Sequence, residues 1–173
     1  EMLNIPLGDF NRGTLGQPSF EWQGQRIAPN IIYEDLFGEE LAARFFDPAQ
    51  APTVLVNFSN IGWFGNTLAV DQHLQISRMR ALELERPMVR ATNTGATVII
   101  DHRGVVTHAL ERFSRGVLRG EVHGRGLGVS GDAGITPFAW WASRWGLWPL
   151  WLLAGLGVAA GWLGRRRRTQ AQA

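Results

Sequence analysis

Twenty consecutive residues near the C-terminus, Trp145–Gly164, contain no charged side chain. A helix rises about 1.5 Å per residue, so this run can cross the roughly 30 Å hydrocarbon core of a lipid bilayer. Tryptophans crowd its start and Trp162 lies near its end, as is typical of residues at the two headgroup interfaces. Four arginines follow at positions 165–168. We therefore predict a Trp-flanked transmembrane helix over residues 140–164 and a basic tail over residues 165–173.

The arginine run also predicts which way this helix points. Basic residues flank the cytoplasmic ends of membrane helices, so the tail should be cytoplasmic and the residues before Trp140 should lie on the other side. The alternative, a buried helix of a large soluble protein, is disfavoured by an apolar run that ends in four arginines. The sequence opens at Glu1 without a signal peptide, and an exported domain needs an upstream segment to carry it across. We therefore expect the C-terminal piece of a longer protein.

The chain contains neither cysteine nor lysine, so its basic side chains are all arginine. Disulfides and cysteine-ligated metals are therefore excluded. The four histidines are scattered without the spacing of a zinc site, and we predict no metal and no cofactor. The formal net charge is +2, and removing the four tail arginines leaves −2 on the rest of the chain. Because the basic run abuts a predicted membrane span, we expect contact with anionic lipid and no nucleic-acid partner.

The region before residue 123 alternates short apolar runs with helical patterns, and it predicts an α/β or α+β domain over residues 1–123. The predicted strands cover residues 27–32, 53–58, 88–91, 96–101 and 105–110, with 116–122 as a further candidate. The predicted helices cover residues 36–46 and 66–85; the second has Val70, Leu74, Ser77, Ala81 and Leu84 on one face. Glycines favour a linker over residues 124–139.

Four segments carry a recognisable pattern. They are APNIIYED at residues 28–35, NFSNIGWFG at 57–65, QHLQ followed by RMRALE within 72–83, and RATNTG at 90–95. In this order, and with the closing tryptophan-rich run and basic tail, they resemble the C-terminal half of the apolipoprotein N-acyltransferases. These are bacterial inner-membrane enzymes whose catalytic domain belongs to the nitrilase superfamily. The resemblance implies part of a nitrilase-like α-β-β-α sandwich on the periplasmic face, in a protein that is multi-pass in its full-length form.

The resemblance also implies a reaction and its partners. An acyl chain passes from a phospholipid to an enzyme cysteine as a thioester, and then to the α-amino group of a diacylated cysteine at a lipoprotein's N-terminus. The superfamily uses Glu, Lys and Cys for this chemistry, and the family's nucleophile lies in an ICYE motif. The aligned residues here are Ile31, Ile32, Tyr33 and Glu34, so Ile32 occupies the nucleophile position. The Glu and Lys are expected upstream of Glu1.

The other candidate site residues come from two segments. By the resemblance, the backbone N–H of Tyr33 faces the oxyanion and its ring shapes the acyl pocket, while Glu34 orients the site. Taken alone, Tyr33 is better explained as a packed core aromatic and Glu34 as an acid at a helix N-terminus, and the resemblance reverses this preference. Trp63 and Phe64 either line a path for the lipid substrate or pack within their own loop.

Several more polar residues match recurring family positions. We predict structural ion pairs and hydrogen bonds, rather than chemistry, for His73, Arg78, Arg80, Glu83, Arg90 and Asn93. Asn57, Ser59 and Asn60 are predicted to satisfy buried backbone groups near the aromatic loop.

These observations leave three hypotheses of function. The first is a fragment of an apolipoprotein N-acyltransferase that is inactive as written, because isoleucine has no lone pair to form a thioester. The second is a membrane-tethered, nitrilase-like binding or scaffold protein without catalysis. The third is a relative of the soluble carbon-nitrogen hydrolases, which the tryptophan-rich span disfavours. Half a sandwich would also expose an apolar sheet face.

Overall fold

The computed structural model describes residues 13–129 and 134–170, with the side chains of the last helix described as far as residue 166. Its centre is a six-stranded sheet with strand order β1-β2-β3-β4-β5-β6. The strands are β1 (Phe20–Trp22), β2 (Gln25–Ile31), β3 (Val54–Ser59), β4 (Met88–Thr92), β5 (Val98–Ile100) and β6 (Val106–Ala109). Five of these match predicted strands to within a few residues. Sequence reasoning missed β1, which pairs with β2 through a two-residue turn at Gln23 and Gly24, both with positive φ.

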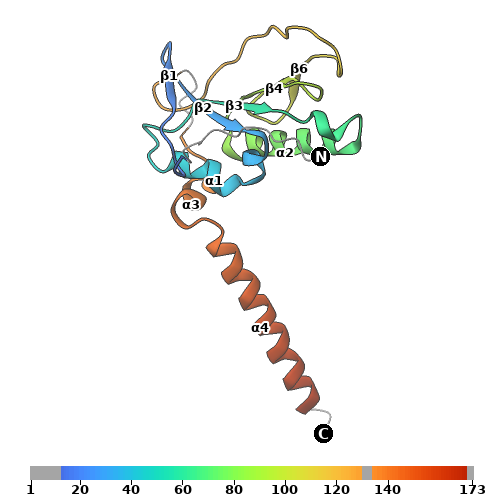
Figure 1. The fold of residues 1–173 in the computed structure, drawn as a ribbon. Coiled ribbons are helices and arrows are strands. Elements are labelled where there is room, and N and C mark those ends of the chain that lie inside the picture. The colour runs from blue at the N-terminus through green and yellow to red at the C-terminus, as the bar shows by residue number, and fades with distance from the viewer. Residues whose placement is uncertain (1–12, 130–133, 171–173) are drawn as a thin grey trace.

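Strands β2, β3 and β4 are parallel, while the pairs β1–β2, β4–β5 and β5–β6 are antiparallel. Parallel neighbours need a crossover connection, and short helices supply it here. The first crossover contains η1 (Ile32–Leu36), α1 (Gly38–Ala42) and η2 (Ala43–Phe45); the second contains η3 (Gly62–Phe64) and α2 (Leu68–Leu84). Both α1 and α2 lie on the same face of the sheet (Figure 1). The prediction of mixed α/β layers is confirmed.

Helix α2 agrees with the predicted helix over residues 66–85. Val70, Ser77, Ala81 and Leu84 are buried as expected, and Leu74 is partly buried. His73 also lies on the buried face, which the apolar pattern alone did not indicate. The helix ends at Glu85, which adopts the left-handed conformation with φ 49° shortly before Pro87.

The predicted continuous helix over residues 36–46 is wrong, because η1, α1 and η2 replace it. Phe37 breaks the helical backbone with φ −101° and ψ 84°. The following residue, Gly38, is buried, and a β-carbon there would lie 2.2 Å from the guanidinium of Arg80. The close packing of residue 38 against α2 therefore outweighs the helix propensity of this segment.

The further candidate strand over residues 116–122 is also wrong, since this segment forms no strand. Gly120 packs against the side chain of Ile99, and a β-carbon on it would lie 2.5 Å from the Ile99 Cδ1 atom. On β5 the buried neighbours Val98 and Ile100 belong to the core next to the helices, so alternation points Ile99 to the other face. The segment therefore contacts that face and does not extend the sheet at β6.

The sheet face opposite α1 and α2 is only partly covered. On this face Ile31 is 60% exposed and Phe58 is 53% exposed, and these two residues are register partners in β2 and β3. The described residues of the predicted linker also contact the domain. The Arg125 N–H donates to the Thr53 carbonyl at 3.1 Å, and Arg26 donates to the Leu127 carbonyl at 2.8 Å. Residues 130–133 of that segment lie outside the described residues.

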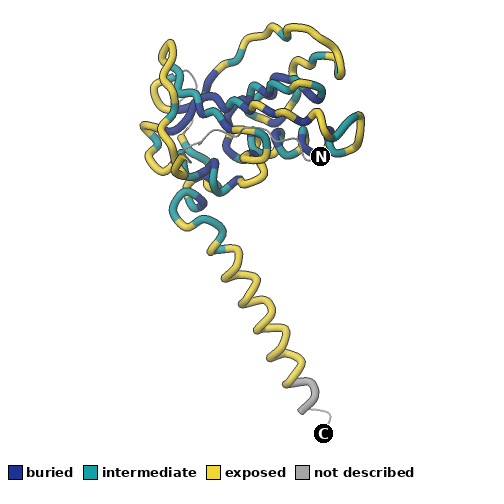
Figure 2. The backbone as a smooth tube through the Cα atoms, viewed as in Figure 1, coloured by how far each residue is buried: buried dark blue, intermediate teal, exposed yellow. Residues whose placement is uncertain are grey.

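The predicted helix over residues 140–164 is divided into α3 (Pro137–Trp145) and α4 (Trp148–Gln170). The two helices meet at 89°, and Gly146 between them has φ 56°. The division follows packing: Ala139 and Ala142 are buried in the domain core, whereas α4 extends away from it and is exposed from Leu150 to Arg166 (Figure 2). Within the described part of the chain, no single helix is long and apolar enough to cross a membrane. The pair Pro137–Trp145 and Trp148–Arg166 meets those criteria together, by length and composition.

Candidate functional site

The carboxyl ends of β2, β3 and β4 meet at one edge of the sheet. An open pocket of about 540 Å³ lies there. It is lined by Ile31, Ile32, Phe58, Ser59, Asn60, Ala91, Thr92 and Asn93. Ligands of α/β sheets bind outside the carboxyl ends of parallel strands. This edge, together with the turn formed by residues 31–35, is the candidate site.

The turn after β2 holds Ile32 in an uncommon backbone conformation. Ile32 has φ 49°, and a β-branched side chain is a genuine outlier in this left-handed region. Such a residue costs on the order of 1–3 kcal/mol and persists only where its surroundings fix it. Two hydrogen bonds do so here: the Ile31 N–H donates to Glu34 Oε2 at 2.6 Å, and Asn57 Nδ2 donates to the Ile32 carbonyl at 3.3 Å. The structure therefore gives Glu34 a defined local role, which is to close the turn around residue 32.

A row of polar residues crosses the helix-facing side of the same strands. Strand register pairs Asn30 with Asn57, and Asn57 with Arg90, and all three are fully buried. Asn57 Nδ2 donates to Asn30 Oδ1 at 2.5 Å, and Ser59 Oγ donates to Asn57 Oδ1. The Asn57 amide does donate to a backbone carbonyl, but that carbonyl is the partly buried one of Ile32 in the turn after β2 and does not belong to the aromatic loop. Ser59 and Asn60 bind side chains, those of Asn57 and Asn93, so the prediction that these three residues satisfy backbone groups near the loop is wrong. The row itself depends on the register, which the sequence does not display.

Below the turn, four buried side chains form a closed hydrogen-bond network: Asp35, His73, Ser77 and Arg90. His73 and Ser77 are four residues apart on α2 and therefore share one face. His73 Nε2 lies 3.0 Å from Asp35 Oδ1, and Arg90 Nη2 lies 2.7 Å from His73 Nδ1. A guanidinium only donates, so Nδ1 must accept, and Nε2–H donates to the carboxylate. Ser77 Oγ accepts from Arg90 Nη1 at 2.6 Å and donates to Asp35.

The network joins η1, α2 and β4, and Asn57 links it to residue 32, since Asn57 accepts from Arg90 Nη1 at 3.4 Å and donates to the Ile32 carbonyl. Arg90 Nη1 also lies 3.4 Å from Asp35 Oδ2, so the network contains a fully buried ion pair. Burial lowers the pKa of the Arg90 guanidinium, and the Asp35 charge opposes that change. The sequence predicted structural hydrogen bonds for His73 and Arg90, and both residues form such bonds in the structure. It missed Asp35 as their partner, because nothing local to residue 35 identifies contacts that are 38 and 55 residues away.

The other recurring polar residues also make structural contacts. Arg80 pairs with Glu83 at 2.8 Å, and Arg78 Nε donates to the Gly104 carbonyl at 2.7 Å. Asn93 accepts from the Ile61 N–H at 3.1 Å and donates to Asn60 Oδ1 at 2.7 Å. The predicted ion-pair and hydrogen-bond roles are confirmed for this set.

Next to His73, three aromatic residues from two segments form a rim in which Tyr33 and Trp63 are exposed and Phe64 packs partly buried against the core. The Tyr33 ring packs edge to face against Phe64 at 6.3 Å and lies 5.7 Å from the His73 ring. Trp63 packs against Phe64 at 6.3 Å, and its Nε1–H donates to the Tyr33 hydroxyl at 3.4 Å. Tyr33 is 40% exposed and Trp63 is 59% exposed. The structure thus brings together the predicted residues Tyr33, Trp63 and Phe64, although they are 30 residues apart in the sequence.

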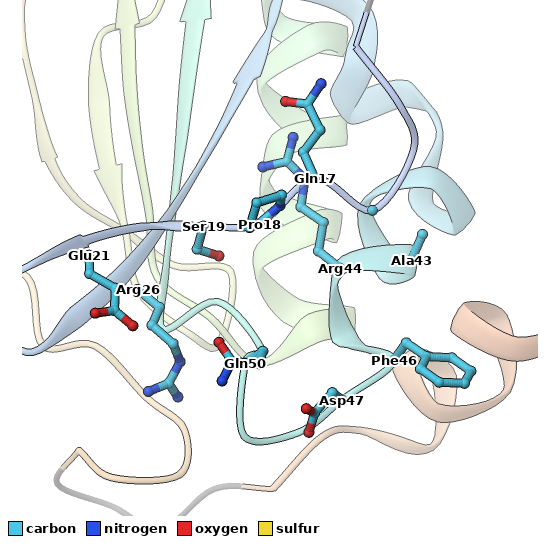
Figure 3. Close-up of a pocket in the computed structure, with 11 residues that line it drawn as sticks. Gln17, Pro18, Ser19, Glu21, Arg26, Ala43, Arg44, Phe46, Asp47 and Gln50 are labelled. Atoms are coloured by element: carbon cyan, nitrogen blue, oxygen red, sulfur yellow. The ribbon is translucent and has the colours of Figure 1, made fainter.

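A second pocket, of about 250 Å³, lies between the β1–β2 side of the domain and η2 (Figure 3). Arg26, Arg44, Glu21 and Asp47 are among its lining side chains. Burial lowers the pKa of Arg44, and the negative charge of Glu34 opposes this change. None of the residues lining this pocket belongs to the turn at 31–35. Across residues 13–129 and 134–170, no three His, Asp or Glu side chains gather into a group that could hold a metal ion.

The sequence profile of the carbon-nitrogen hydrolase family matches residues 4–125. The chain belongs to this family. Among curated relatives, the apolipoprotein N-acyltransferase of Verminephrobacter eiseniae is 76% identical over 145 residues, which are 84% of this chain and 27% of that protein. The enzyme of the same name from Ralstonia nicotianae is 51% identical over 170 residues, covering 98% of this chain and 30% of that protein. The chain therefore spans less than a third of the length of these relatives.

Solved structures show the same fold at low sequence identity. A mutant amidase of the nitrilase superfamily from Nesterenkonia sp. AN1 is 18% identical, with a TM-score of 0.53 over 82% of this chain and 50% of the amidase. Another structure of an amidase from Nesterenkonia sp. is 20% identical, with a TM-score of 0.50 over 63% of this chain and 42% of that one. The predicted nitrilase-like fold of this carbon-nitrogen hydrolase chain is confirmed.

Proposed function

We propose that this carbon-nitrogen hydrolase chain is the C-terminal part of an apolipoprotein N-acyltransferase, with Ile32 at the position of the nucleophile. The named relatives support the family reaction, which transfers an acyl chain from a phospholipid to the N-terminus of a lipoprotein. One structural observation carries the assignment of position 32: its left-handed backbone at the mouth of the pocket where β2 ends. Strained strand-to-helix turns of this kind hold nucleophiles exposed at the edges of α/β sheets.

The proposed reaction has two steps. A carboxylate takes the proton of the cysteine thiol, and the thiolate attacks the carbonyl carbon of the phospholipid ester. The ester C–O bond then breaks, and the lysophospholipid leaves as an alcohol because its oxygen takes that proton from the carboxylic acid. The lipoprotein amine then attacks the thioester, the C–S bond breaks, and the amine proton returns to the carboxylate. An isoleucine side chain has neither a lone pair nor an acidic proton. We therefore propose that the chain as written forms no acyl-enzyme intermediate.

The neighbouring residues have roles that follow from their contacts. Glu34 closes the turn through the Ile31 N–H, so it positions residue 32 and the Tyr33 N–H that faces the oxyanion. Tyr33, Trp63 and Phe64 form a contiguous apolar rim beside the pocket, which suits an acyl chain. The partners in this proposal are the phospholipid donor and the diacylated lipoprotein N-terminus.

The proposed location is the bacterial inner membrane. The α3–α4 pair meets the length and composition required for membrane crossing, and the four tail arginines follow the apolar residues within α4. The domain would be periplasmic and the C-terminus cytoplasmic. Protease added to sealed inside-out vesicles should then cut the tail and leave residues 27–122 protected; the opposite pattern would contradict this orientation.

A matched pair of chimeras tests the proposed function. Residues 1–173 replace the corresponding segment of the V. eiseniae relative, once with Ile32 and once with Ile32→Cys. Incubation with a phospholipid carrying a labelled acyl chain should give a hydroxylamine-sensitive labelled protein only for the Ile32→Cys chimera. Ile31→Cys, one residue earlier in the exposed strand end, is the control and should remain unlabelled.

The alternative is a membrane-tethered protein of the same fold that binds without catalysis, and the isoleucine at position 32 favours it. In that case the Ile32→Cys chimera would fold and insert, as judged by protease resistance, yet remain unlabelled. Labelling of the Ile32 chimera itself would contradict the assignment of position 32.

A further inference from the structure

Helix α3 is fixed to the domain at its start. Thr136 Oγ1 donates to the Glu83 carbonyl at 2.6 Å and accepts from the Ala139 N–H at 3.1 Å, so one hydroxyl both caps α3 and ties it to the end of α2. The buried guanidinium of Arg86 donates to the Gly134 carbonyl at 3.2 Å. Ala142, further along the helix, is buried in the core. The orientation of α3 relative to the sheet is therefore set by packing and hydrogen bonds.

Helix α4 leaves this anchored helix at nearly a right angle. Its charge-free part, residues 148–164, contains apolar residues on all sides and is exposed except for the half-buried Pro149 (Figure 2). A helix that is apolar all round belongs in a bilayer or a core. About 17 residues is the lower end of the range for a membrane helix. If α4 follows the bilayer normal, the 89° angle lays α3 parallel to the membrane surface.

The outward side of α3 has the composition of a membrane-water interface. Trp140 is 47% exposed and Trp145 is 51% exposed, and their rings meet edge to face at 5.2 Å. Arg144 lies between two aromatic rings, with its Cζ 5.0 Å from the Trp140 centroid and 4.9 Å from the Phe46 centroid. Phe46 is 59% exposed and comes from the end of η2, so domain and helix share this surface.

Charge favours a lipid headgroup as the occupant of this surface. Residues 134–164 contain no acidic residue, and Arg144 is the single charged side chain among them. Arg144 Nη1 donates to the Trp140 carbonyl at 3.0 Å and to Ser143 Oγ at 3.3 Å, and Nη2 donates to the Phe46 carbonyl at 3.4 Å. The Nε–H and the second Nη2–H are therefore the donors that would meet a phosphate oxygen, and indole rings prefer the same headgroup layer. The surface is also continuous with α4, so a lipid bilayer is the partner that meets both.

We propose that α3 is an interfacial helix that seats the domain directly on the bilayer, with Trp140, Arg144, Trp145 and Phe46 in the headgroup layer and Arg144 on a lipid phosphate. This inference rests on the membrane location proposed above. It assigns α3 to the surface and not to the span.

The absence of cysteine in the sequence allows a direct depth measurement. Single nitroxide labels are placed at Ser143→Cys on α3, Gly155→Cys in the middle of α4, and Arg103→Cys in the turn before β6, in the full chain in vesicles of phosphatidylethanolamine and phosphatidylglycerol. Accessibility to oxygen and to a polar nickel complex gives the depth. We expect position 143 in the headgroup layer, position 155 in the hydrocarbon core and position 103 in water.

The outcomes separate the two proposals. A label at 143 in water, with 155 in hydrocarbon, would overturn the interfacial helix and leave the membrane span intact. Labels at 143 and 155 that are both deep in hydrocarbon would overturn it too, because α3 would then be part of the span. A label at 155 in water would overturn the membrane location and, with it, this inference.

The role of Arg144 has its own test. Arg144→Gln should weaken association of α3 with the anionic surface by about fivefold, the expected contribution of one basic residue near such a surface. The readout is the exchange between surface-bound and water-exposed signals of the label at 143. Arg112→Gln, on the loop after β6, is the matched control and should leave this exchange unchanged. Equal effects of the two substitutions would contradict phosphate binding by Arg144.

Discussion

Two buried arginines, Arg86 and Arg90, flank the start of β4 and solve the same physical problem in different ways. Their relative exposures are 1% and 0%. Arg90 binds side chains, namely Asp35, His73, Ser77 and Asn57. Arg86 binds the carbonyl oxygens of Pro52, Leu84, Glu85 and Gly134, and its guanidinium lies 5.3 Å from the Phe45 ring centroid. Arg90 therefore orders side chains of the candidate site, whereas Arg86 holds loop segments against the domain through their carbonyl groups.

The two environments differ in what balances the buried charge. For Arg90 burial lowers the pKa and the Asp35 carboxylate opposes the change. For Arg86 the pKa is lowered to about 10, chiefly by burial and also by the neighbouring charge of Arg125, while the charge of Glu85 opposes the change. Removal of Arg90 therefore leaves a buried carboxylate without its cation, whereas removal of Arg86 leaves carbonyl groups that are neutral.

The largest expected effect follows from this difference. Arg90→Gln should lower the free energy of unfolding by about 3–5 kcal/mol, the cost of breaking a buried ion pair from one side. Urea unfolding followed by circular dichroism measures it. The double variant Arg90→Gln with Asp35→Asn should recover part of the loss, because it removes the unpaired charge. Additive losses in the double variant would show that the two residues are not coupled.

Arg86→Met should cost less, about 1–3 kcal/mol, because only neutral hydrogen-bond acceptors lose their partner. The effect should be local to the docking of α3. Hydrogen exchange should therefore speed up at Ala139 and Ala142 and stay unchanged in η1. A larger loss of stability than for Arg90→Gln would contradict the comparison between the two arginines.

The smallest effect concerns the turn that the Arg90 network supports. Ile32→Gly should be less destabilising than Ile31→Gly by about 1 kcal/mol, since glycine adopts the left-handed conformation of residue 32 without the penalty of a β-carbon. Ile31 has an extended φ of −121° and is the matched control. Urea midpoints of the two variants give the difference. If Ile32→Gly is the more damaging change, strain at position 32 is not stored in the native state.

Sequence patterns predicted β2 to β6 and α2 well, because apolar periodicity and flanking proline, glycine and aspartate residues act locally. The family resemblance also assigned residues 31–34 to the site, and it left Trp63 and Phe64 either lining a path for the lipid substrate or packing within their own loop. The sequence patterns did not predict the Asp35 network, because it depends on strand register and on contacts between segments that are distant in the sequence. They joined residues 36–46 into one helix, because the packing of Gly38 against Arg80 is likewise non-local.

The sequence by itself determined the chemistry available at position 32 and the absence of any thiol or lysine. It also determined the presence of a charge-free run whose length as a helix equals the thickness of a bilayer's hydrocarbon core. These are properties of side chains and need no contacts. Only the tertiary structure decided that the tryptophan-rich segment divides at Gly146, because Ala139 and Ala142 are held in the core while the following helix has nothing in the domain to pack against. Only the tertiary structure, too, placed Arg90 in the network that contacts the candidate site and Arg86 against the segment that leads into α3. Burying a guanidinium is costly at both positions. The neighbours that the fold brings to each arginine decide its role, which is to bind side chains at the candidate site for Arg90 and backbone carbonyls for Arg86.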